Sequence, residues 1–527
     1  MTLPKKLVHL LKCLALSSGL AACATNTTSV LEDNLLEISI NELQVAYAEE
    51  LISAVKLVEF YQARIAELDP QLNSVIELNP DALTIAAELD EERQAGQVRS
   101  SMHGVPVLLK DNIDTADRMH TTAGSLALVN APTPAEDAHL VQRLRAAGAI
   151  ILGKANLSEW ANFRSSSSAS GWSARGGQTR NPYILDKSPC GSSSGSGVSV
   201  SANLVMVAIG TETDGSVVCP SSINGIVGIK PTLGVVSRSG IIPIAHSQDT
   251  AGPMARSVTD AAILLNAMVG IDASDLASVA AGSRVILDYT RFLSRNGLRG
   301  KRIGVVRQLF NDSAALNNLL ENQLAILEQG GATLVDVEFD NMEVMSDAEY
   351  QVLTYEFKAD LNAYLENRGG DYQSLASLIA FNIENEELEM PYFGQETFEQ
   401  AQALGDLSDE AYINALSTAK RLSQADGIDA VMAEYDLDAL VAPGNDVAWS
   451  IDYENGDNLG SYIASSSLAA ISGYPSITVP AGFIDELPIG LLFFAGAFDE
   501  PLLIAIAYDY EQRSLARRQP KFLLTNE

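Results

Sequence analysis

The chain has 527 residues, of which 47% are hydrophobic and 19% are charged, and its formal net charge at pH 7 is −33. This composition supports a large buried core, in one big domain or two to three ordinary ones, and excludes intrinsic disorder. Four cysteines are too few for a disulfide scaffold, and so acidic a surface repels phosphate backbones, which excludes nucleic acid as an expected partner.

The N-terminal residues are predicted to be an export signal rather than part of the fold. Three lysines flank the start of the apolar run CLALSSGLAA (13–22), which is shorter than the about 20 residues that cross a bilayer. The run ends in LAAC, which resembles a bacterial lipobox and implies a signal peptide over 1–22, lipidation of Cys23 and a polar tether over 23–36. We expect export to the bacterial cell envelope, facing the periplasm, with membrane contact only through a lipid anchor at Cys23. A plain cleaved secretory signal is the alternative.

Beyond the tether, helix and strand patterns alternate. Ser39 and Glu42 are spaced as a capping box, and a second helix is expected from Ser53 until Asp69-Pro70 stops it. Residues 139–153 are predicted as a helix that ends at Gly148, followed by a strand. A further helix is expected over 312–329, and strands are expected over 105–109, 204–210, 301–306, 332–339, 439–444, 475–482 and 488–496.

This alternation indicates an α/β architecture with a large, mostly buried sheet. Residues 340–430 are acidic and favour helix, and we expect them to form a lobe or lid over one face of the sheet. The polar stretch 159–183, which contains two tryptophans, is a candidate for a loop that lines a substrate channel; a packed surface loop is the alternative.

The stretch SPCGSSSGSG (188–197) is a dense serine-glycine run. A Walker phosphate loop is excluded, because the first lysine after the glycines is Lys230. A nucleophile elbow centred on Ser193 needs a hydrophobic strand before it and a histidine downstream, yet the polar NPYILDKSPC precedes it and no histidine follows His246. A linker is disfavoured because the run lies between two structured segments.

Serine chemistry without histidine still requires a base. A lysine serves when burial lowers its pKa enough to leave it neutral, and Lys110 ends an apolar strand where such burial is expected. Gly215 directly precedes Ser216, and a turn of this kind exposes a nucleophile beside backbone N–H donors. No zinc motif occurs, so we expect no metal and no other cofactor. Cys190 and Cys219 are predicted to be two buried thiols, with a disulfide as the alternative.

Together these features resemble the amidase signature family. The matching segments are HGVPVLLKDNID (103–114), CGSSSGSG (190–197), GTETDGSVVCPSSINGIVGIKPT (210–232) and the late PSITVPAG. Ser192 and Ser216 are 24 residues apart and Pro220 follows, as in the core of that family. The likeness runs from about residue 39 to 515, and the GTETDGS variant is similar to the peptide amidase subgroup. The resemblance to this family implies a single large domain over 37–520, with a mixed β-sheet core covered by helices.

The resemblance also implies roles for individual residues. Lys110 matches the family's catalytic lysine, Ser192 matches the serine that follows a cis peptide bond, and Ser216 matches the nucleophile. The oxyanion hole would be the backbone N–H groups of Thr213, Asp214, Gly215 and Ser216, and the supporting residues would be Gly191, Ser193 and Thr211.

The implied function is hydrolysis of a carboxylic amide through an acyl-enzyme. Many family members have an arginine two residues after the nucleophile; here that residue is Val218, which favours neutral acyl groups. We expect a small-molecule or peptide amide as substrate, with a peptide C-terminal amide as the leading candidate. The alternatives are the amidase component of a tRNA-dependent amidotransferase, disfavoured by export, and a non-catalytic amide-binding lipoprotein.

Overall fold

The computed structural model describes residues 35–457 and 462–525. The predicted signal peptide over 1–22, Cys23 and most of the polar tether therefore lie outside the described residues. In the described part of the chain, no helix combines the length and the apolar character that crossing a membrane requires.

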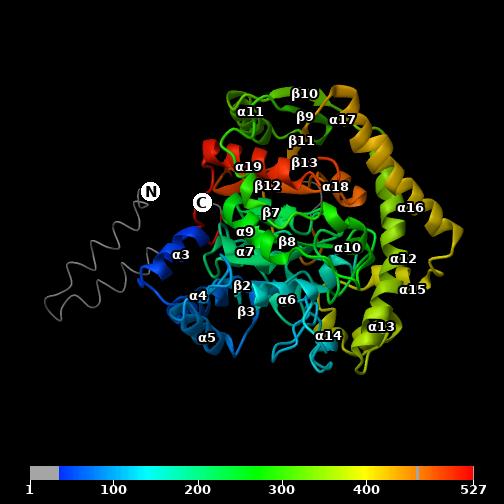
Figure 1. The fold of residues 1–527 in the computed structure, drawn as a ribbon. Helices are drawn as coiled ribbons and strands as arrows, with labels where there is room; N and C mark the ends of the chain where they lie inside the picture. The colour runs from blue at the N-terminus through cyan, green and yellow to red at the C-terminus, as the bar shows by residue number, and fades with distance from the viewer. Residues whose placement is uncertain (1–34, 458–461, 526–527) are drawn as a thin grey trace.

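One mixed sheet runs through the molecule and has helices on both faces (Figure 1). Its strands are β1 (Val75–Leu78), β2 (Pro106–Lys110), β3 (Ile150–Ala155), β6 (Val207–Glu212), β7 (Val227–Lys230), β8 (Thr250–Ala255), β9 (Arg302–Val306), β10 (Thr333–Val337), β11 (Ala439–Pro443), β12 (Ser476–Ile484) and β13 (Leu487–Phe494). They lie in the order β1-β3-β2-β6-β8-β7-β12-β13-β11-β9-β10. Pairing is parallel for β3-β2-β6 and for β11-β9-β10, and antiparallel between β6 and β11 and at β1. The expected α/β domain with a mixed sheet is confirmed.

Helices pack on the sheet and on one another. They are α3 (Ile40–Ala48), α4 (Ala54–Leu72), α5 (Ala82–Gln94), α6 (His139–Ala146), α7 (Ser194–Ser201), α8 (Val218–Ile223), α9 (Val258–Met268), α10 (Leu276–Ala281), α11 (Ala314–Gln329), α12 (Met342–Arg368), α13 (Leu375–Glu384), α14 (Glu386–Glu389), α15 (Glu396–Ala403), α16 (Glu410–Ser423), α17 (Asp429–Tyr435), α18 (Ser467–Ser472) and α19 (Glu500–Ser514). The capping box of α3 is confirmed, because Ser39 and Glu42 each accept the other's backbone N–H. Residues 340–430 are helical, as expected, and form α12 to α17.

Helix α4 extends past the predicted stop. It continues through Pro70 to Leu72 and ends at Asn73, which is left-handed with φ 50°. A proline this close to the end removes only one late N–H donor, so the helix tolerates it. The carboxylate of Asp69 instead accepts the backbone N–H of Ser74 at 2.8 Å, and so fixes the chain where it leaves the helix.

Both faces of the sheet are buried. Along β13, Leu491 and Phe493 belong to the largest apolar core, whereas Leu492 and Phe494 belong to a second core. Helices α9, α11 and α19 pack on the first face, while α12, α16 and α18 cover the second (Figure 1). Because the side chains of the central strands are buried on both faces, these strands are almost continuously apolar rather than alternating with polar residues.

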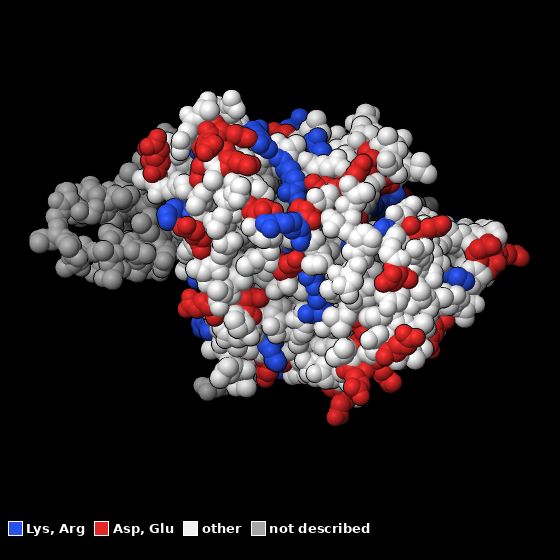
Figure 2. Space-filling view, turned by 90° about the horizontal axis from the view of Figure 1, so that it is seen from below, with Lys and Arg blue, Asp and Glu red and all other residues white. Residues whose placement is uncertain are grey.

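The surface carries the acidic character that the net charge predicts. Figure 2 shows Asp and Glu side chains scattered over the whole of one face, with Lys and Arg between them. An acidic surface repels polyanions, and the expectation of no nucleic-acid partner stays a prediction.

Candidate active site

Lys110, the last residue of β2, is fully buried. Its Nζ lies 2.8 Å from Ser192 Oγ, 2.9 Å from Thr211 Oγ1 and 3.1 Å from the Thr211 carbonyl oxygen. Burial lowers the pKa of Lys110 to about 7, and the nearby carboxylates of Asp249 and Glu212 only partly oppose this shift. A substantial fraction of the amine is therefore neutral at pH 7 and has a lone pair that can accept a proton.

Ser192 lies in the serine-glycine run just before α7 and is fully buried. The peptide bond between Gly191 and Ser192 is cis, and the Ser192 carbonyl accepts the N–H of Ser158 at 3.1 Å. A Cβ added to Gly191 would lie 2.2 Å from Ser158 Oγ, so any larger residue there would force the Ser158 side chain to move. The run is neither a phosphate loop nor a linker, because it brings a serine hydroxyl to the buried lysine.

Thr211, near the end of β6, is held from two sides. Ser193 Oγ donates to its carbonyl oxygen at 3.1 Å and accepts its N–H at 3.2 Å. From the segment after β2, the Asn112 side chain donates to Thr211 Oγ1 at 2.9 Å. Since Thr211 contacts Lys110 through two oxygens, these bonds fix where the amine lies relative to Ser192.

Ser216 lies in the turn between β6 and α8 and is 8% exposed. Its carbonyl accepts the N–H of Ser193 at 3.1 Å, which joins this turn to the serine-glycine run. Within the described residues, the Ser216 hydroxyl has no hydrogen-bond partner. It is the accessible serine hydroxyl of the site, whereas that of Ser192 is enclosed.

The turn from Thr213 to Ser216 presents unpaired backbone donors. In residues 35–457 and 462–525, none of its four N–H groups has a protein acceptor. Glu212 shapes the turn, because its carboxylate accepts the N–H groups of Val217 at 2.7 Å and Val218 at 2.9 Å. Four free N–H groups beside an accessible hydroxyl can bind an oxyanion. The Val218 side chain is buried in the second core, so this position supplies no cation to the site.

A family model described as Amidase matches residues 56–504. The chain belongs to the amidase family. The crystal structure of native peptide amidase from Stenotrophomonas maltophilia superposes with a TM-score of 0.88, at 53% identity over 92% of this chain and 99% of that chain. A probable amidase of Arabidopsis thaliana is 43% identical over 93% of this chain and 92% of its own length. The amidase is thus a serine-type hydrolase that cleaves carboxylic amides, as the sequence predicted.

A more distant relative bears on the alternative function. A glutamyl-tRNA(Gln) amidotransferase component of Pseudomonas aeruginosa is 34% identical over 91% of the amidase and 98% of its own length. This identity is well below the 53% shared with the peptide amidase, so the hydrolase is the better match.

The predicted localisation is wrong. Besides the plant amidase, putative amidases of Schizosaccharomyces pombe and Arthroderma benhamiae match at 36% identity over 93% and 91% of the chain. These relatives come from a plant and two fungi, and such cells have no bacterial envelope. The prediction rested on the resemblance of a short apolar run ending in cysteine to the lipobox pattern.

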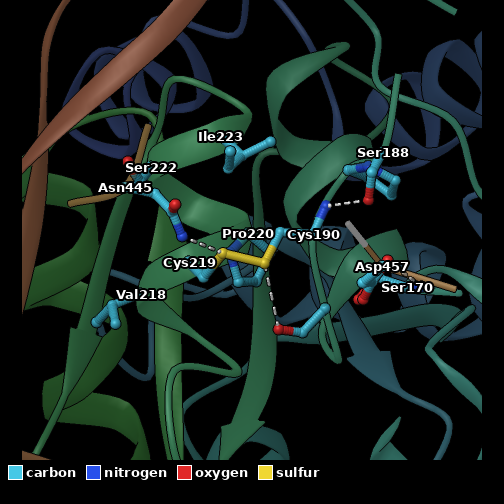
Figure 3. Close-up of a disulfide and its surroundings, with 12 residues drawn as sticks. Ser170, Ser188, Cys190, Val218, Cys219, Pro220, Ser222, Ile223, Asn445 and Asp457 are labelled. Atoms are coloured by element: carbon cyan, nitrogen blue, oxygen red, sulfur yellow. Dashed lines mark hydrogen bonds between the residues drawn. A yellow bond between two sulfur atoms is a disulfide. The ribbon is translucent and has the colours of Figure 1, made fainter. Parts of the chain in front are cut away.

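The prediction of two buried thiols is also wrong. Cys190 and Cys219 form a disulfide, with their Cα atoms 6.1 Å apart, a separation suited to this bond (Figure 3). It joins the residue before Gly191 to α8, three residues after Ser216. Sequence reasoning missed the bond because only the fold brings the serine-glycine run beside α8. Asn445 Nδ2 lies 3.2 Å from Cys219 Sγ (Figure 3).

A cavity of about 400 Å³ lies next to the site. Thr211 and Thr213 line it, together with the apolar segment 241–244 and the carboxyl group of Asp249. Burial raises the pKa of Asp249 to about 6, although Thr213 Oγ1 donates to it at 2.6 Å. From the polar stretch 159–183, Ala161 lines this cavity. The cavity gives space for part of a bound molecule beside the turn.

Proposed function

We propose that the amidase acts through Ser216 as nucleophile, Ser192 as proton relay and Lys110 as base. The observation that carries this proposal is the 2.8 Å contact between Lys110 Nζ and Ser192 Oγ inside a fully buried site. Neutral Lys110 takes the Ser192 proton while Ser192 takes the proton of Ser216, whose Oγ then bonds to the amide carbon.

The tetrahedral intermediate carries a negative oxygen, which the N–H groups of Thr213, Asp214, Gly215 and Ser216 would stabilise. Removing one such donor in other enzymes costs about 3–4 kcal/mol of transition-state stabilisation, so the turn is an essential part of the site. The relay then returns a proton to the leaving nitrogen, and the C–N bond breaks to release ammonia or an amine. Water attacks the resulting Ser216 ester, the acid leaves, and the lysine is neutral again.

The substrate proposed is a neutral primary or simple secondary amide, with a peptide C-terminal amide as the leading candidate. The likeness to a protein named peptide amidase, at 53% identity, supports this class. Val218 supports it as well, because an apolar residue at that position offers no cation to an anionic acyl group. The reaction as written uses only side chains and backbone of the amidase domain, proposed to span 37–520, and needs no cofactor.

Ammonia release identifies the substrate class. We expect C-terminally amidated peptides to yield ammonia at a higher kcat/KM than aryl, fatty or small aliphatic amides, and a fluorophosphonate probe to label Ser216. Equal or faster release from the other amides would contradict the peptide assignment. If Ser216 were unlabelled and no amide were hydrolysed, the relay itself would be refuted. Ammonia produced from glutamine only after partner proteins are added would instead support the amidotransferase alternative.

The relay predicts a pH dependence. Below pH 7 Lys110 is mostly protonated and accepts no proton, so kcat/KM should fall about tenfold for each pH unit below this value. Above pH 7 the neutral amine predominates, so the ionisation of Lys110 no longer changes kcat/KM. Initial rates of ammonia release between pH 5 and 9, with stability checked at each pH, measure the profile. A rate that stayed constant from about pH 5 to 7 would contradict a lysine base with the lowered pKa.

A further inference from the structure

Asp214 lies in the oxyanion turn, and its side chain is held in place. Ser466 Oγ donates to one carboxylate oxygen at 2.5 Å, and Ser467 Oγ donates to the other at 2.7 Å. Both serines lie at the start of α18. Asp214 therefore ties the turn that contains Ser216 to a helix more than 200 residues away in the sequence.

Glu349, from the N-terminal third of α12, reaches the same turn and is 6% exposed. Gln248 links the two, because its Nε2 donates to Glu349 Oε1 at 2.8 Å and to the Thr213 carbonyl oxygen at 3.2 Å. The Glu349 carboxyl group also hydrogen-bonds the Asp214 carboxyl group. Two carboxyl groups can share such a bond only when one of them carries a proton.

The proton belongs on Glu349. Burial, followed by the charge of Asp214, raises the pKa of Glu349 well above its usual range. Asp214 receives two serine hydroxyl bonds, which favour its charged form and oppose the upward shift that burial causes in its pKa. The other titratable groups that interact with this pair are Glu212 on β6, Lys230 on β7, Lys420 on α16 and Tyr462.

We propose that Glu349 is a positioning residue for amide hydrolysis, which holds the oxyanion turn by donating to Asp214 and by accepting from Gln248. The inference rests on the proposed role of the Thr213–Ser216 turn. Within its two hydrogen bonds, Glu349 Oε1 acts as a carbonyl acceptor and its hydroxyl acts as the donor. When Glu349 loses its proton, the donor disappears and two like charges face each other, so the turn loses its alignment with the substrate.

Glutamine is the matched replacement, because its oxygen accepts from Gln248 and its NH₂ group donates to Asp214 at any pH. We expect Glu349→Gln to keep kcat within about twofold of the wild type at pH 7, because both hydrogen bonds persist in this variant.

Glu349→Ala removes both hydrogen bonds and should lower kcat by about tenfold while changing KM by less than about threefold, because misalignment acts on the chemical step. Glu366→Gln is the control, since Glu366 is exposed on the same helix. The kcat and KM of this variant should match those of the wild type. An alanine variant with unchanged kcat would overturn the inference.

A folded Glu349→Gln variant whose kcat fell by about tenfold would also overturn it, because both hydrogen bonds persist in that variant, and this arm remains decisive if the alanine variant fails to fold. Failure of the proposed function looks different, because the wild type itself would then leave Ser216 unlabelled by fluorophosphonate. If this inference alone failed, the wild type would still be labelled and would still hydrolyse amides.

Discussion

Lys110→Met is expected to lower kcat for amide hydrolysis by about 10²–10⁴-fold, the range that a positioned base contributes. Methionine fills a similar volume and is apolar, so it suits the buried site better than a charged lysine would. It has no nitrogen to accept the Ser192 proton, and the relay stops at its first step. Ammonia release measured beside thermal unfolding separates lost chemistry from a lost fold.

Lys110→Arg tests whether a neutral amine, rather than a positive charge, is required. Arginine retains the charge and the donors, but its pKa above about 12 prevents it from acting as a base, so we expect a loss as large as that in Lys110→Met. The control is Lys154→Met, which removes another fully buried lysine from the neighbouring strand β3. Lys154 Nζ bonds the Ile113 carbonyl and Thr121, away from the relay, so this variant should lose stability but keep kcat within about tenfold. Full turnover by Lys110→Met would rule out the mechanism.

The parts of the fold that sequence predicted are those set by local pattern. The apolar run at 439–444 became β11, and the run at 105–109 became β2, shifted by one residue so that Lys110 is its last member. Strand β6 was predicted over 204–210 but spans Val207–Glu212, because Thr211 and Glu212 pair with β8. Polar residues that look like a turn in sequence can continue a strand when a neighbouring strand satisfies their backbone.

The parts of the site that sequence missed depend on contacts between distant segments. Lys110, Ser192 and Ser216 stand in recognisable motifs, whereas the hydrogen bond between Gln248 and Glu349 joins residues 101 positions apart. Glu349 lies in an acidic helix where most carboxylates are solvated, and no local pattern distinguishes it from its neighbours. The order of the strands also depends on contacts between distant segments, since β12 lies beside β7 only because the chain returns across the sheet.

Loss of the Cys190–Cys219 disulfide is expected to lower the free energy of unfolding by roughly 3–4 kcal/mol. The bond closes a loop with a sequence separation of 29, and the unfolded chain regains the freedom of that loop when the bond is absent. The double variant Cys190→Ala/Cys219→Ala gives the effect as a shift in the midpoint of chemical denaturation. Both sulfurs are buried, so two alanines also leave a small void that adds to the loss.

Activity should decline as the free energy of unfolding falls, because the bond joins the serine-glycine run, which contains Ser192, to the helix that follows Ser216. Each single variant leaves one buried thiol and no cross-link. We therefore expect the free energies of unfolding of Cys190→Ala and Cys219→Ala each to lie within about 1 kcal/mol of that of the double variant. If the two cysteines made independent contacts, the losses in the two single variants would instead sum to the loss in the double variant. Peptide mapping without reductant should recover residues 190 and 219 in one linked fragment. Separate, alkylatable cysteines in the untreated protein, or additive losses from the two single variants, would show that the contact is packing between thiols rather than a covalent tie across the site.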